Sequence, residues 1–152
     1  MKNHDVFMSA AIEEAERGGK AGGIPIGSVL VYEERIIGRG HNRRVQDGSV
    51  IHHAEMNCLE NAGRLRAEVY HNARLYTTLS PCSMCCGAIL LYGIPWVVIG
   101  ENQSFMGDEA LLKARGVKVE VLDDDRLLML MRRFIAEHPS LWNEDIGVES
   151  RS

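Results

Sequence analysis

Residues 74–100 read RLYTTLSPCSMCCGAILLYGIPWVVIG, and this stretch decides the fold class of the chain. Residues 74–79 are rich in β-branched and aromatic side chains, as strands are. Ser80-Pro81 then marks a turn into a helix over 82–92, because proline suits the first helical turn. Residues 95–100 follow as a short buried strand. The stretch therefore predicts a strand, a helix and a second strand in direct succession.

The same alternation continues on both sides of this stretch. Before it we expect a helix with an apolar stripe, a hairpin over Glu33-Glu34, a polar loop and a second helix. After it we expect a helix, a strand, a long amphipathic helix and a last short segment. In chain order, the expected elements are a helix over 5–19, two paired strands over 26–32 and 35–41, a loop over 42–50, a helix over 53–66, a helix over 108–115, a strand over 117–122, a helix over 123–137 and a last segment over 139–146.

This order predicts an α/β sandwich with a mixed sheet, in which an antiparallel first pair is followed by parallel strands. The chain has 152 residues and a mass of 17.0 kDa, which suits one domain over 1–152. A chain of this length buries roughly 70% of the surface that its unfolded form exposes. It therefore needs no disulfide to hold a core.

Composition excludes several classes of protein. Hydrophobic residues make up 45% and charged residues 25%, so a disordered, collagen-like or coiled-coil chain is not expected. No apolar run is long enough to span a bilayer, and the N-terminus has no secretory signal pattern. The net charge is −4 and no basic tract exists, which argues against a polynucleotide partner because phosphate contacts need cations.

Four cysteines occur, and three of them crowd into residues 82–86. Cys82 and Cys85 are spaced i,i+3 at a predicted helix start, where their side chains share a face and the helix dipole favours thiolates. Two thiolates on one face are half of a tetrahedral zinc site. A lone CxxC motif leaves zinc binding, redox chemistry and chance open as explanations.

His53 offers a third ligand, also at a predicted helix start. Three protein ligands leave one position for water or hydroxide, which distinguishes a catalytic zinc from a structural one. Glu55 lies about 200° around the helix from His53, so we expect it beside the bound water and not as a ligand. There it can carry protons. The alternative is a histidine that caps a helix and cysteines that only pack a core.

The combined pattern is H-x-E, 25 intervening residues and P-C-x-x-C, which is the signature of zinc-dependent base deaminases. The resemblance extends over nearly the whole chain: it is similar to the cytidine deaminase-like superfamily and, within it, to fungal-type cytosine deaminases. The similar segments are GRGHN (38–42), LENAGRL (59–65), LYTTLSPC (75–82), GAILLYGIP (87–95) and EDIG (144–147).

The resemblance implies a three-layer α/β/α sandwich with a five-stranded mixed sheet and one Zn²⁺ per subunit. It implies hydrolytic deamination of a free nucleobase, cytosine to uracil plus ammonia, with Glu55 as the catalytic proton carrier. Asn42 would hydrogen-bond the base, and Asp145 would hold its exocyclic amine. The other substrate-binding positions that the resemblance implies are Ala54, Leu79, Ser80, Phe105, Trp142 and Ile146.

This chain departs from the fungal pattern at two positions. Ala54 stands where that family has glycine between the histidine and the glutamate, and Asn143 stands where it has phenylalanine after the tryptophan. Both departures concern the choice of base more than the type of reaction. Deamination of guanine or of another amino-heterocycle such as a triazine therefore stays open, as does deamination of tRNA adenosine, which the acidic charge opposes. A zinc module without catalysis would need a fourth protein ligand.

The resemblance also implies a homodimer. The absence of a signal pattern favours a reducing, cytoplasmic compartment, in which disulfides between the four cysteines are the less favoured interpretation. A nucleobase substrate would place the reaction in pyrimidine salvage, with no polynucleotide and no membrane as partner.

Overall fold

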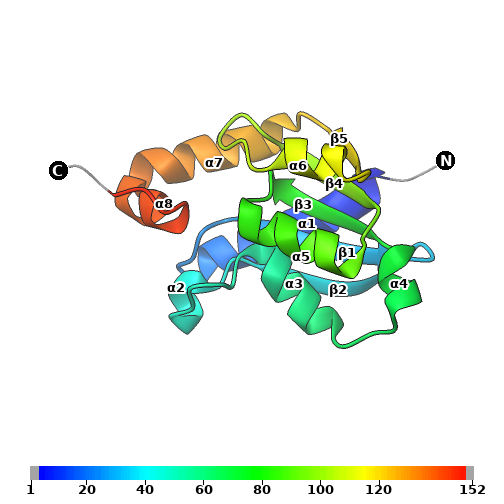
Figure 1. The fold of residues 1–152 in the computed structure, drawn as a ribbon. Helices are drawn as coiled ribbons and strands as arrows, with labels where there is room; N and C mark the ends of the chain where they lie inside the picture. Colours follow the sequence, from blue (N-terminus) through cyan, green and yellow to red (C-terminus); the bar gives the residue numbers. More distant parts are fainter. Residues whose placement is uncertain (1–3, 150–152) are drawn as a thin grey trace.

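The computed structural model describes residues 4–149. A five-stranded sheet with the order β2-β1-β3-β4-β5 forms the centre of the molecule (Figure 1). The elements are α1 (His4–Lys20), β1 (Gly27–Tyr32), β2 (Arg35–His41), α2 (Arg44–Asp47), α3 (Ala54–Ala62), α4 (Ala67–His71), β3 (Arg74–Leu79), α5 (Ser83–Tyr92), β4 (Trp96–Glu101), α6 (Glu109–Ala114), β5 (Lys118–Val121), α7 (Asp125–Glu137) and α8 (Pro139–Asp145).

The sheet is mixed, as predicted. β1 pairs antiparallel with β2 and with β3, whereas β4 pairs parallel with both β3 and β5. The hairpin turns at Glu33 and Glu34, which both adopt positive φ angles of 51° and 60°. Tight turns of this hand match the right-handed twist of the two strands, and the predicted hairpin is confirmed.

Helices cover both faces of the sheet and give it three layers. Side chains alternate along each buried strand, so neighbouring residues enter different cores. Leu75 packs in one core with residues of α3, α4, α5 and α6, while Tyr76 packs in the other with residues of α1 and α7. The fold is therefore the predicted α/β/α sandwich with a five-stranded mixed sheet.

Two predicted elements differ from the structure. The helix expected over 53–66 ends at Ala62, because Gly63 (φ 92°) leaves the helical conformation, and a separate helix α4 follows. The loop expected over 42–50 contains the single-turn helix α2, closed by an ion pair of 3.0 Å between Arg43 and Asp47. Side-chain pairs four residues apart stabilise one helical turn that the polar sequence does not reveal.

The C-terminal helix α8 lies beyond the end of the sheet, next to α7 (Figure 1). A third apolar cluster connects it with the start of α3 and the end of β3 through Trp142, Ala54 and Leu79. This packing places α8 over the edge at which α3 and α5 begin. Among residues 4–149, no helix combines the length and apolar character needed to cross a bilayer.

Candidate metal centre and active-site pocket

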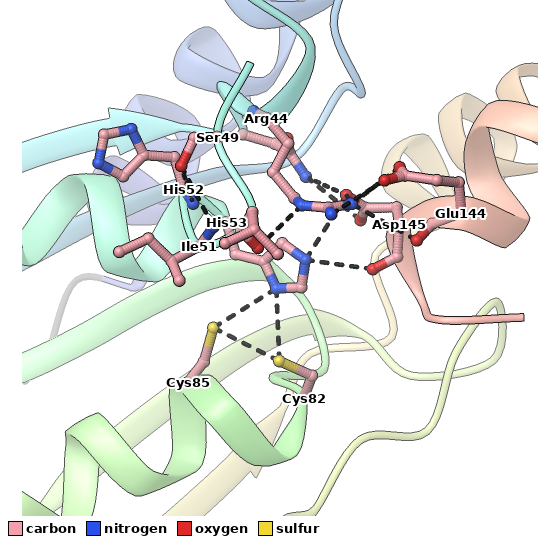
Figure 2. A network of polar contacts seen from close by, with 11 residues as sticks. Arg44, Ser49, Ile51, His52, His53, Cys82, Cys85, Glu144 and Asp145 are labelled. Carbon is pink, nitrogen blue, oxygen red and sulfur yellow. Dashed lines mark hydrogen bonds and ion pairs between the residues drawn. The ribbon is translucent and has the colours of Figure 1, made fainter. Parts of the chain in front are cut away.

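Three potential metal ligands meet where two helices begin. His53 immediately precedes α3 and Cys82 immediately precedes α5, both in extended conformation, while Cys85 lies in the first turn of α5. The Nδ1 atom of His53 lies 3.3 Å from Sγ of Cys82 and 3.7 Å from Sγ of Cys85, and the two sulfurs are 3.7 Å apart (Figure 2).

These separations fit a zinc ion. With Zn–S bonds of about 2.3 Å and Zn–N bonds of about 2.0–2.1 Å, a tetrahedron separates two sulfurs by about 3.8 Å and a sulfur from a nitrogen by about 3.6 Å. Within the described residues, no fourth His, Cys, Asp or Glu joins the three in a metal-binding group. The donor set is thus that of a catalytic site with one open position and not that of a closed structural site.

The second ring nitrogen of His53 is also held. Nε2 lies 3.3 Å from the backbone oxygen of Asp145 and 3.5 Å from its Oδ1 atom. A metal-binding histidine commonly donates its other N–H to a carbonyl or a carboxylate, which fixes the ring orientation. The contact therefore directs Nδ1 of His53 towards the two sulfurs, and it comes from a residue 92 positions along the chain.

Electrostatics favour an ionised sulfur at Cys82. The hydrogen bond with Cys85 lowers the pKa of the Cys82 thiol to about 4, against the opposing effect of burial and with further help from His53. The positive end of the α5 dipole acts in the same direction. Since the thiolate is the form that binds metal, Cys82 is prepared for a cation.

Glu55 lies in the first turn of α3 and is 4% exposed. Thr77 of β3 donates a hydrogen bond of 2.9 Å from its hydroxyl to Oε1 of Glu55. Burial raises the pKa of the Glu55 carboxyl, and the nearby His53 opposes this rise. A buried carboxyl with a raised pKa can both accept and return a proton near neutral pH.

A narrow pocket opens beside these groups. The structure brings all of the predicted site residues together around it except Cys85, which is fully buried and is not part of the lining. The pocket lining also includes Ile26, which the sequence patterns did not single out. The lining residues are Ile26, Asn42, His53, Ala54, Glu55, Leu79, Ser80, Cys82, Phe105, Trp142, Asp145 and Ile146.

The polar end of the pocket is a pair of side chains, Asn42 and Asp145, that are 103 positions apart in the chain. Nδ2 of Asn42 donates to both carboxylate oxygens of Asp145, at 3.1 and 3.2 Å. The amide oxygen of Asn42 accepts from the backbone N–H of Arg44, which orients the amide. Burial raises the pKa of Asp145, but hydrogen bonds with His53, Asn42 and Arg44 outweigh it and lower the pKa below its ordinary value.

The Ser80 hydroxyl both donates and accepts a hydrogen bond within the protein. It donates to the Glu109 carboxylate at 2.6 Å and accepts from the N–H of Gly107 at 2.9 Å. Ser80 therefore fastens the loop that carries Phe105 to the pocket. The buried Glu109 was not predicted, because a single glutamate at a helix start carries no distinctive signal. Thr77 and Arg44 were missed because a single threonine in a strand and a single arginine in a polar segment carry no distinctive signal either.

Comparison with known proteins agrees with this geometry. Residues 1–101 match the family model for the cytidine and deoxycytidylate deaminase zinc-binding region. The chain is 51% identical over 141 residues to a cytosine deaminase of Candida albicans, covering 92% of this chain and 94% of that protein.

More distant similarities extend to RNA-editing enzymes. A tRNA-specific adenosine deaminase of Streptococcus pyogenes is 38% identical over 129 residues, or 84% of this chain and 77% of that protein. A structure solved in a study of tRNA:A34 deaminases superposes with a TM-score of 0.70 at 28% identity, covering 84% of this chain and 99% of the other. These relatives are named for different substrates.

Proposed function

Because this chain belongs to the cytidine and deoxycytidylate deaminase zinc-binding family, we propose that it hydrolyses the exocyclic amino group of the free base cytosine, releasing uracil and ammonia. The observation that supports the proposal is the position of buried Glu55 beside the ligand trio His53, Cys82 and Cys85, in a pocket that α8 covers. We take residues 1–152 as a single catalytic domain.

The metal of this family is zinc, and His53, Cys82 and Cys85 would hold it. When bound, zinc acidifies a water molecule and so supplies a nucleophile at neutral pH. His53 contributes Nδ1, since Asp145 engages its other ring nitrogen.

Glu55 moves the protons of the reaction. It takes one proton from water and delivers it to the ring nitrogen beside the carbon that bears the amino group, which makes that carbon electrophilic. The hydroxide left from that water forms a bond to this carbon, and Glu55 then transfers the proton of the new hydroxyl to the amino group, so that the C–N bond breaks, ammonia leaves and a carbonyl forms. The Thr77 hydroxyl holds Oε1 of Glu55 in place for both transfers.

Asn42 and Asp145 orient the base, which carries no charge for the site to attract. Oδ1 of Asp145 accepts from Asn42 and Arg44, while Oδ2 accepts from Asn42 and keeps capacity for a substrate amine. Asn42 has N–H groups for a ring acceptor. A base with the wrong polar edge leaves these buried groups unpaired, at about 1–3 kcal/mol each.

Apolar side chains enclose the flat faces of the base. The rings of Phe105 and Trp142 lie edge to face with centroids 6.2 Å apart, and Trp142 is 5% exposed. This cover favours a free base over a nucleotide within a polynucleotide. Of the two departures from the fungal pattern, Ala54 lines the pocket, whereas Asn143 is not among the lining residues.

A substrate panel tests the proposal. The purified, zinc-loaded chain is assayed for ammonia release from cytosine, guanine, adenine, cytidine and creatinine. We expect turnover of cytosine to exceed that of every other compound. Faster release from guanine or from another amino-heterocycle would show that the base is misassigned while the reaction class stands. Retention on tRNA at physiological salt, with release of ammonia, would favour the editing function instead.

We further propose that the chain acts as a homodimer in the cytoplasm and serves pyrimidine salvage. Exposed apolar side chains at Ile51, Leu91 and Tyr92 border one groove and support a contact between copies. Analytical ultracentrifugation is expected to give twice the 17.0 kDa mass of one chain. A sedimenting species with the mass of a single chain would contradict the dimer.

A further inference from the structure

We propose that Arg44 is a positioning residue that fastens α8 over the pocket and aims the Asp145 carboxylate at the substrate. The proposal rests on the function proposed above. Arg44 is not itself among the residues that line the pocket, so it acts through its partners.

The Arg44 guanidinium binds two consecutive carboxylates at the end of α8 (Figure 2). Nη1 and Nη2 donate to the two carboxylate oxygens of Glu144, at 2.9 and 3.0 Å. Nη1 also donates to Oδ1 of Asp145 at 3.2 Å. Paired N–H groups that meet both oxygens of one carboxylate define direction as well as distance.

The two ion pairs of Arg44 differ in how deeply they are buried. The Arg44 side chain is 11% exposed and that of Asp145 is 3% exposed, whereas that of Glu144 is 61% exposed. Water screens the pair with Glu144, so that pair contributes little by itself. The pair with Asp145 is desolvated, and loss of the guanidinium would leave this buried carboxylate with only Asn42 and His53 as partners.

Arg44 is anchored on its other side to the loop that follows β2. Its Nε atom donates to the backbone oxygen of Val50, and its backbone N–H donates to the Asn42 side chain. One residue thus holds both members of the Asn42–Asp145 pair, Asn42 through its main chain and Asp145 through its side chain. Without these bonds, α8 would keep its apolar packing but lose the fixed orientation of Asp145.

The test replaces Arg44 with methionine, which keeps much of the aliphatic volume and removes the charge and all guanidinium bonds. We expect KM for cytosine to rise at least tenfold while kcat falls less than threefold. The reason is that Asp145 would bind the base less tightly, whereas proton transfer by Glu55 would be unchanged. Zinc content should stay at the wild-type value. Simple loss of folded enzyme would lower kcat and leave KM unchanged.

Hydrogen exchange provides a readout that does not depend on activity. In Arg44→Met we expect the amides of α8 to exchange at least tenfold faster than in the wild type. Glu144→Gln removes only the exposed ion pair, so it should change both α8 exchange and KM much less than Arg44→Met does. Arg44→Lys keeps the charge without the paired geometry and should fall between the wild type and Arg44→Met.

Arg43→Met is the matched control. Arg43 is the adjacent arginine and pairs with Asp47 within the same loop, so its loss should leave KM and α8 exchange within twofold of the wild type. If Arg44→Met does not fold, Arg44→Lys carries the comparison. If the wild type deaminates cytosine and the Arg44 variants keep its KM and its rate of α8 exchange, the inference is overturned. A wild type that does not act on cytosine would instead refute the proposed function, and the exchange data would still test the α8 contact.

Discussion

At the scale of single residues, Glu55 illustrates how one side chain takes its role from its surroundings. Its carboxyl is buried at the start of α3, bonded to Thr77, and close to the ligand trio. Burial alone would favour the neutral acid, while the neighbouring His53 favours the carboxylate. Two opposing influences of this kind suit a group that must gain and lose a proton in each turnover.

Glu55→Gln tests this role directly. The substitution keeps the size of the side chain and removes its ability to carry a proton, so kcat should fall by more than the ~10²–10⁴ of one acid–base step. Zinc content, measured by atomic emission, should remain that of the wild type. Glu60→Gln, on the exposed face of the same helix, should leave kcat unchanged. A Glu55→Gln enzyme that retains a tenth of the wild-type rate would refute the mechanism.

At the scale of elements, helix α1 depends on the absence of a side chain in β1. A Cβ atom at Gly27 would lie 2.0 Å from the backbone oxygen of Ala11 and 2.5 Å from the backbone nitrogen of Ala15. Backbone atoms within a helix cannot move aside singly. The close approach of α1 to the sheet therefore requires glycine at this position.

We expect Gly27→Ala to lower the free energy of unfolding by about 1–3 kcal/mol or more, since the added methyl group forces α1 away from the sheet. Gly87→Ala is the matched control on α5. Apart from the adjacent backbone of α5 itself, no atom lies within 4 Å of the Cβ position there, so Gly87→Ala should instead raise stability by about 0.5–1 kcal/mol. Urea unfolding of both variants measures the difference. Equal stability of the two variants would contradict this account of the contact between α1 and β1.

Helix α7, on which α8 packs, begins at a charged cap. The Asp124 side chain accepts a hydrogen bond of 3.0 Å from the backbone N–H of Arg126 and pairs with the Arg126 guanidinium. This hydrogen bonding lowers the pKa of the Asp124 carboxyl below its ordinary value, although burial opposes the effect. The folded protein therefore favours the ionised form of Asp124 more than the unfolded chain does.

Asp124→Ala should cost about 0.5–2 kcal/mol of stability at neutral pH, because an N-cap is lost. A pKa lowered by folding gives stability that is complete above the ordinary pKa of aspartate and is lost as the pH falls through the folded value. The wild type and Asp124→Ala should therefore converge in stability in acid. Thermal unfolding from pH 7 down to pH 3 measures this. If the difference in stability between the wild type and Asp124→Ala stays constant over this pH range, the charge of Asp124 does not contribute to stability.

At the scale of the whole molecule, the ligand trio joins three parts of the chain. His53 precedes α3, the cysteines begin α5, and the second nitrogen of His53 meets the end of α8. A metal bound there should stabilise the folded state, since the unfolded chain does not hold these atoms together.

Removal of zinc by a chelator should abolish activity and lower Tm by about 5–10 °C. This estimate assumes zinc at about 100 times its Kd, which adds about 2.7 kcal/mol, and a shift of about 2–4 °C for each kcal/mol. Added zinc should restore both properties.

His53→Ala should lose the metal, whereas His52→Ala should keep it, because His52 bonds to Asp47 and Glu60 and not to the trio. Full activity after exhaustive chelation would contradict the metal centre.

Much of the fold followed from local patterns. The five strands and most helices could be placed from the sequence, because their signals lie in neighbouring residues. These signals are alternating polarity, runs of β-branched residues, and glycine or proline residues at turns. The errors fell at α2 and α4, which are one or two turns long. A short helix forms because of a few side-chain bonds, and a periodic pattern needs more residues than that to be visible.

The candidate ligands and Glu55 could also be identified from the sequence, because their spacing reflects the geometry of two helix starts. Three further contacts became visible in the folded molecule alone: those of Arg44 with Glu144 and Asp145, 100 and 101 residues away, that of Asp145 with the second nitrogen of His53, and that of Ile26 with the pocket. Such contacts depend on how complete elements pack on one another. Packing brings together residues whose separation along the chain carries no periodic signal.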